Sequence, residues 1–155
     1  MPKEAKYGYL RGPRLLIQAW PIAASQVIVD RGSKFVILDA NDRIAIAGSG
    51  NTQIEGWLEH PTGQGLNAGF TTSATAGADS GAVDISPLSV YRAPADADPA
   101  NTRGETADLI VNSNVQQIDV GESNEDVVYI VDLDTTDDTV DVCMTSRLMA
   151  VAGVA

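Results

Sequence analysis

The stretch at residues 34–47, KFVILDANDRIAIA, decides the fold class of this chain. Its first five residues form an apolar run rich in β-branched and aromatic side chains, which is typical of a strand. The segment 39–42 (DAND) consists of residues that favour turns. Alternation of polar and apolar residues then resumes over 43–47. The stretch therefore predicts two short strands joined by a turn.

Short strands and turn signals recur along the rest of the chain, and helical spacing is hard to find. Regularly spaced short strands of this kind indicate an all-β protein of sandwich or barrel type. The expected strands lie at 15–20, 26–29, 34–38, 43–47, 52–59, 82–86, 88–92, 107–111, 115–120, 127–133, 139–145 and 147–151.

Composition shifts divide the chain into four predicted parts. Residues 1–14 are polar and interrupted by Gly and Pro, and we expect an extended arm there. Residues 15–92 are expected to form a β domain with a long Gly/Ala/Thr-rich loop at about 62–81. Residues 93–103 (APADADPANTR) have the composition of a linker, and 104–155 are expected to form a second, smaller and acidic β domain.

The overall composition is that of a globular protein, with 44% hydrophobic and 20% charged residues among 155. A net charge of −11 argues against nucleic acid and anionic membranes as partners of the body. No apolar run is long enough for a membrane span, and the N-terminus lacks a signal-peptide pattern. The single Cys143 fits a reducing compartment. We therefore expect synthesis and assembly in a cytosol.

Charge is sorted along the sequence. The first fourteen residues hold four bases and only Glu4 as an acid, whereas residues 93–146 hold thirteen acids and only Arg103 as a base. The arm also carries two tyrosines, and Tyr and Arg often anchor interfaces. We expect the arm to order on an acidic partner through Lys3, Lys6, Tyr7, Tyr9, Arg11 and Arg14.

The sequence contains few of the residue patterns that indicate a catalytic site. The chain has one histidine, His60, which precedes Pro61 where a turn is expected. No Gly-x-Ser-x-Gly elbow is present, and Cys143 alternates with its neighbours inside a predicted strand. A triad could still assemble in space. A protein that is not an enzyme is nevertheless the better interpretation.

Two weaker site patterns are also present. Asp132, Asp134, Asp137 and Asp138 surround a predicted hairpin tip, where oxygen ligands could suit Ca²⁺ or Mg²⁺. Their spacing departs from the EF-hand pattern, so a solvated turn explains them more simply, and no metal or other cofactor is expected. Trp57 lies between Glu55 and Glu59, which could form a sugar-binding face or an ordinary strand face.

Two blocks of sequence resemble a family of virus proteins. These blocks are KFVILDANDRIAIAG…TQIEGWLEHP, from residue 34 to 61, and YRAPADADPANTRGETADLIVNSNVQQIDVGES…VVYIVDLDTTDDTVDVCM, from 91 to 144. In pattern and residue style they are similar to the head-decoration, or capsid-stabilising, proteins that are encoded beside the major capsid protein in tailed bacteriophages. The resemblance includes no diagnostic motif.

The resemblance implies a compact β fold, a β-tulip or β-barrel-like domain, that attaches to the outside of an expanded phage head. It also implies a homotrimer whose N-terminal arms contact the major capsid protein. Possible subunit contacts are the large side chains of Trp20, Trp57 and Phe70, for which core packing is the ordinary alternative. The acidic part at 104–155 departs from the smallest members of this family.

We therefore expect a structural virion protein on the capsid exterior, with the capsid and its own copies as partners. One alternative is another particle component, such as a minor capsid, head-fibre or tail protein. A second is a carbohydrate-binding β module that uses Trp57, and a third is a small hydrolase centred on His60.

Overall fold

The computed structural model describes residues 7–29, 31–59 and 70–145. Those residues form an all-β protein, as the sequence predicts. Its elements are the strands β1 (Gly8–Arg11), β2 (Leu16–Pro21), β3 (Val27–Ile28), β4 (Phe35–Leu38), β5 (Ile44–Ile46), β6 (Gly56–Leu58), β7 (Phe70–Thr71), β8 (Ser80–Asp84), β9 (Val90–Pro94), β10 (Thr106–Asn112), β11 (Val115–Asp119), β12 (Val128–Asp134) and β13 (Thr139–Met144).

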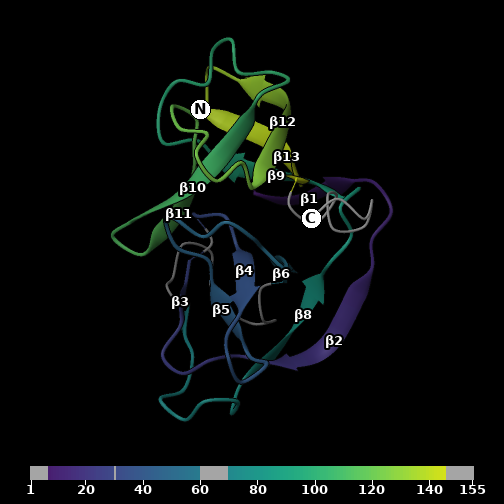
Figure 1. Ribbon diagram of the computed structural model, residues 1–155, viewed down its shortest axis with the longest axis vertical. Coiled ribbons are helices and arrows are strands. Elements are labelled where there is room, and N and C mark those ends of the chain that lie inside the picture. Colours follow the sequence, from purple (N-terminus) through teal and green to yellow (C-terminus); the bar gives the residue numbers. More distant parts are fainter. Residues whose placement is uncertain (1–6, 30, 60–69, 146–155) are drawn as a thin grey trace, which may run out of the picture.

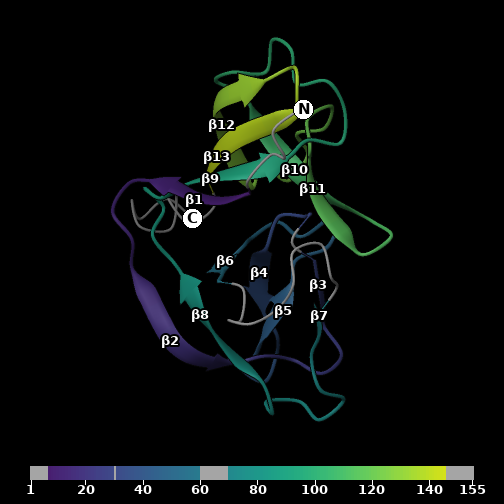
Figure 2. The same ribbon diagram turned by 180° about the vertical axis from the view of Figure 1, so that it is seen from behind.

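The strands form three open antiparallel sheets. The larger sheet has the order β1-β9-β13-β12-β10-β11, and the smaller main sheet has the order β2-β8-β6-β4-β5. Figure 1 shows the two sheets in the upper and lower halves of the molecule, with β2 running along the outside. From behind, the third sheet of β3 and β7 lies beside β5 (Figure 2).

Turn chemistry explains where the strands of the smaller sheet are joined. The Asp39 carboxylate accepts hydrogen bonds from the backbone N–H groups of Asn41 and Arg43, at 2.8 and 3.0 Å. Asp42 adopts a positive φ of 58°, which Asp tolerates better than most residues. The turn between β4 and β5, predicted at 39–42, is therefore confirmed.

Both hairpins predicted in the second half of the chain are also present. Ser113 and Asn114 have φ values of 50° and 66°, and this pair of left-handed residues joins β10 to β11. At the other hairpin, Asp134 accepts hydrogen bonds from the backbone N–H groups of Thr136 and Asp137. This arrangement closes the turn between β12 and β13.

The main hydrophobic core lies between the two large sheets. Phe35 and Trp57 from the smaller sheet pack in one cluster with Tyr91 and Val142 from the larger sheet. Trp57 stacks on Tyr91 with ring centroids 4.5 Å apart, and Phe35 meets Trp57 edge to face at 4.8 Å. A second, smaller cluster around Ile22, Ile44 and Val83 lies within the lower half. The two halves therefore share one core.

One strand pairing connects the two parts of the chain that are predicted to be β domains. β9, which begins inside the predicted first domain at Val90, pairs with β13 of the second. The predicted linker at 93–103 starts within β9, and its residues Ala93 and Ala95 are buried. Small side chains that look like a linker in the sequence are here packed between strands, so 93–103 is structured at its start.

The extended N-terminal arm and the β-tulip are not confirmed. Residues 8–11 of the predicted arm form β1, which pairs with β9 through Gly8–Arg92 and Tyr9–Tyr91. Residues 1–6, residues 62–69 of the long loop predicted at about 62–81, and the closing strand predicted at 147–151 lie outside the described residues. The described part of that loop contains β7 and the start of β8. None of the described residues forms a helix long and apolar enough to cross a membrane.

Candidate functional site

A fully buried carboxylate, that of Asp84, marks a polar site in the described part of the chain. Asp84 ends β8, and its side chain is fully buried at the junction of the two main sheets. Burying a charge is costly unless the charge is paired and hydrogen-bonded. The protein meets that cost with donors from the N-terminal segment and from residues 86–91.

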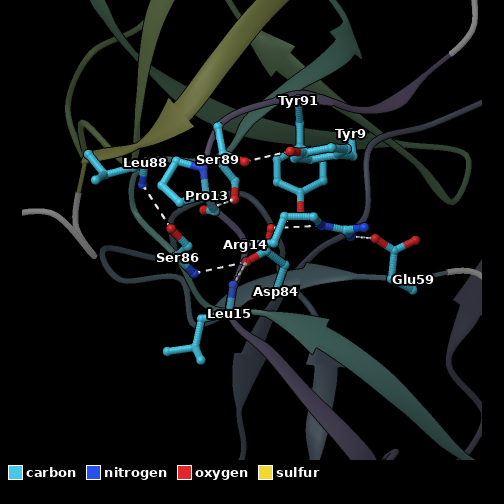
Figure 3. Close-up of polar contacts among 11 residues, drawn as sticks. Tyr9, Pro13, Arg14, Leu15, Glu59, Asp84, Ser86, Leu88, Ser89 and Tyr91 are labelled. Atoms are coloured by element: carbon cyan, nitrogen blue, oxygen red, sulfur yellow. Dashed lines mark hydrogen bonds and ion pairs between the residues drawn. The ribbon is translucent and has the colours of Figure 1, made fainter.

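Each oxygen of Asp84 has partners. One accepts hydrogen bonds from the backbone N–H groups of Leu15 and Ser86, at 3.1 and 3.0 Å. The other accepts the hydroxyl proton of Tyr91 in a short hydrogen bond and lies 3.4 Å from Nε of Arg14. Figure 3 shows these groups converging on Asp84 from both sides of the junction.

Arg14 connects this carboxylate to the surface. Its guanidinium pairs with Glu59 as well as with Asp84. It also lies 4.3 Å from the ring centroid of Tyr9, in a cation–π contact, and Tyr9 meets Tyr91 edge to face at 5.9 Å. We call these five residues, Tyr9, Arg14, Glu59, Asp84 and Tyr91, the N-terminal anchor.

Hydrogen bonds also hold the backbone of the N-terminal segment near the anchor. Ser89 donates its hydroxyl proton to the carbonyl of Pro13 at 2.9 Å, and Tyr9 donates to the carbonyl of Gly12. Gly12 has a φ of 98°, and a Cβ there would lie 2.2 Å from the carbonyl oxygen of Leu88. Only glycine therefore permits this close passage of the N-terminal segment over the 86–89 turn.

The anchor shifts the pKa values of its two central groups. Burial alone would raise the pKa of Asp84, but hydrogen bonds from Tyr91 and from the backbone outweigh it and lower that pKa. Burial, together with the bond to Asp84, raises the pKa of Tyr91 above its ordinary range. Asp84 is therefore held as an anion and Tyr91 as a neutral donor.

The structure describes only some of the predicted arm residues, and these have different surroundings. Lys3 and Lys6 lie outside the described residues, whereas Tyr9 and Arg14 belong to the anchor. Arg11 is exposed at the end of β1. Tyr7 is half-buried, and its pKa is raised by burial and by the charge of Asp137. The first strand therefore lies near the acidic hairpin of the same chain.

The three aromatic residues predicted as possible subunit contacts have different surroundings. Trp57 is 1% exposed and lies in the main core, so it cannot form the open sugar platform that the carbohydrate-binding alternative needs. Trp20 and Phe70 are half-buried and pack against the smaller cluster. Trp20 also donates its Nε1–H to the carbonyl of Asp42 at 3.1 Å.

The acidic hairpin is organised by turn and ion-pair contacts. Hydrogen bonding from the backbone N–H of Leu133 and from Arg103 lowers the pKa of Asp132. Arg103 lies 2.6 Å from that carboxylate, and Asp134 closes the turn. Asp132, Asp134, Asp137 and Asp138 are not part of any cluster of three or more potential metal ligands within residues 7–29, 31–59 and 70–145.

The two residues considered for catalysis are His60 and Cys143. His60 lies outside the described residues. Cys143 occupies β13 as predicted, and burial raises the pKa of its thiol. A raised thiol pKa disfavours the reactive thiolate.

Sequence reasoning missed the acidic half of the anchor. Asp84 is a single acid in the apolar run AVDI at 82–85, and that contrast is the signal that could have marked it. Glu59 and Tyr91 carry no comparable local signal.

Compared with protein-family models, with curated proteins and with solved structures, the chain matches none.

Proposed function

We propose that this chain is a structural protein of a tailed-bacteriophage particle, which binds the outer surface of the capsid and stabilises the head. The observation that carries the proposal is the N-terminal anchor. It fixes residues 8–15 on an all-β body, and the two bases Lys3 and Lys6 precede this fixed segment in the sequence.

The edge position of β1 supports this role. β1 is the outermost strand of the larger sheet, and Tyr9 and Arg11 are exposed on it. Exposed Tyr and Arg are residue types that often contribute strongly to interfaces. Arg11, together with the bases Lys3 and Lys6 that precede it in the sequence, would supply positive charge for an acidic capsid surface, while Arg14 is engaged with Asp84 and Glu59.

The charge of the remaining chain is compatible with a shell protein. The chain carries a net charge of −11, and acids gather at exposed turns such as 134–138. Like-charge repulsion between such surfaces would keep decorated particles apart in solution. A symmetric shell also multiplies weak contacts into stable attachment, so each copy needs only a small interface.

Binding to empty, expanded heads of the parent phage tests this function. The purified protein is expected to sediment with the heads, and the double variant Lys3→Glu/Lys6→Glu is expected to lose most of this binding. The matched control is Arg31→Glu/Arg43→Glu, which changes the net charge by the same amount away from β1. Equal loss in both variants, or no binding by the unmodified protein, would refute the proposal.

A further inference from the structure

The edge strand β2 has an unusual composition for a surface strand. Residues 15–29 contain no charged side chain, although the chain as a whole carries a net charge of −11. Leu15, Leu16 and Ile17 are nevertheless exposed, at 55%, 37% and 38%. Within the described residues β8 is the one strand that pairs with β2 (Figure 1).

Edge strands normally carry features that prevent pairing with another chain, such as charges, prolines and bulges. Here the protective features lie in the second half of β2. The pairing with β8 shifts between Ile17 and Trp20, Ala19 has a φ of 53°, and Pro21 ends the strand. Residues 15–17, which precede this shift, include neither a charged residue nor a proline.

The hydrogen-bond register shows which backbone groups face outward. The carbonyl of Leu15 accepts a hydrogen bond from the N–H of Ile85 at 2.9 Å, so the backbone of Leu15 faces β8. Because these groups alternate along an antiparallel strand, the N–H and C=O of Leu16 face away from β8, whereas Ile17 pairs with Val83 of β8. The N–H of Gln18 points opposite to the Ile17 carbonyl across their shared planar peptide bond, so it also faces the open edge. The open edge therefore offers a donor and an acceptor from Leu16 and a further donor from Gln18.

We infer that a second copy of this chain pairs with β2, strand to strand and antiparallel, about a twofold axis at Ile17. In this register the carbonyl of Leu16 in each copy accepts a hydrogen bond from the N–H of Gln18 in the other. Ile17 then faces its own counterpart in a non-hydrogen-bonded pair, where side chains approach most closely. A twofold contact of this kind is self-complementary by symmetry.

Charge favours a copy of the same chain as the occupant. Two molecules of net charge −11 repel each other over most of their surfaces. At β2 that repulsion is weakest, because residues 15–29 are uncharged and the adjacent Arg14 is already paired with Glu59 and Asp84. The contact is a property of the free protein and needs no capsid. It also predicts a dimer, unlike the homotrimer implied by the family resemblance.

Light scattering coupled to size-exclusion chromatography tests the oligomeric state across protein concentrations. The unmodified chain is expected to be a dimer, and Leu16→Lys is expected to weaken dimerisation about tenfold or more, because it places a charge in each of two cross-strand pairs. Leu88→Lys is the matched control, since Leu88 is 58% exposed but lies outside β2. A trimer, a monomer at all concentrations, or equal effects of both variants would overturn the inference.

Oxidative cross-linking tests the register. Ile17→Cys places two thiols across the axis at a Cα separation of about 4.5 Å, within the range that a disulfide spans. This variant is expected to form covalent dimers under mild oxidation. Leu88→Cys and the unmodified chain, which contains Cys143, serve as controls. No excess of covalent dimer in Ile17→Cys over these controls would overturn the twofold register.

Discussion

Asp84 illustrates how one side chain can position a segment that is remote in sequence. Its carboxylate binds Leu15 and Arg14, which lie 69 and 70 residues before it in the chain. A buried carboxylate that loses its charge leaves donors unpaired, and removing one partner of a buried ion pair is strongly destabilising. Asp84 therefore helps to hold residues 14 and 15 on the body, beside the pairing of β1 with β9.

Replacement of Asp84 by Asn is expected to lower the free energy of unfolding by about 3 kcal/mol, since it removes the buried charge that Arg14 and Tyr91 face. Urea denaturation followed by circular dichroism measures this loss. Asp42→Asn is the matched control, because Asp42 is exposed in a turn and Asn also tolerates its positive φ. A loss of similar size in the control would contradict the role assigned to Asp84.

The effect of Asp84 on stability is expected to depend on pH with a definite sign. The pKa of this carboxyl is lower in the folded protein than its ordinary value, which is about 3.9 for Asp. Its contribution is therefore complete above that ordinary pKa and is lost as the pH falls through the lowered folded-state pKa. The unfolding free energies of the unmodified chain and of Asp84→Asn should converge as the pH is lowered. Parallel curves would contradict this linkage.

At the scale of elements, Gln116 joins the hairpin of β10 and β11 to the smaller sheet. This side chain is 1% exposed, and its Oε1 accepts hydrogen bonds from Ser33 and from the N–H of Phe35, both at 2.8 Å. Its Nε2 donates to the carbonyls of Phe35 and Ala47, at 2.9 and 2.8 Å. A fully satisfied buried amide of this kind fixes the register between two elements.

Gln116→Glu tests this connection with almost no change of shape. The carboxylate cannot donate to the two carbonyls, and a charge would be buried without a cationic partner among the contacts that Gln116 makes in the structure. We expect a loss of about 3 kcal/mol in the free energy of unfolding. Gln117→Glu, on the more exposed face of the same strand, should cost much less. Equal losses would contradict the proposed role of Gln116.

Elements whose signals are local could be predicted from the sequence. The strands around 34–47, the two hairpin turns and the strand position of Cys143 follow from alternation and turn residues. β1 could not be predicted in this way, because GYLR shows no clear pattern and becomes a strand by pairing with β9. The burial of Trp57 was hidden by the flanking Glu55 and Glu59.

The N-terminal anchor was predictable only in part, because its residues are distant in sequence and meet only in the folded chain. Tyr9 and Arg14 stood out in the sequence through their residue types and the charge of their segment. Their partners Asp84 and Tyr91 come from β8 and β9, and sequence spacing contains no information about that encounter. The resulting interpretation assigned Arg14 to an external partner, whereas the folded chain provides one itself.

At the scale of the whole molecule, the shared core makes a clear prediction about unfolding. Phe35 and Trp57 from the smaller sheet pack with Tyr91 of the larger sheet, and Gln116 and the N-terminal anchor add polar connections between the halves. Each half supplies part of the main cluster, so this cluster is incomplete if the other half is lost. We therefore expect one cooperative unfolding transition rather than two separate domain transitions.

Tryptophan fluorescence of a Trp20→Phe variant provides the test, because Trp57 is then the single tryptophan and reports on the boundary between the sheets. Its thermal transition should coincide with the loss of strand signal in circular dichroism. The substitution removes the hydrogen bond from Trp20 to Asp42, so both midpoints should fall together by a few degrees, corresponding to about 1 kcal/mol. The unmodified chain is the control for that shift. Fluorescence that changes well before the circular dichroism signal would mean that the sheets separate before they unfold, and the chain would then consist of two domains with a weak interface.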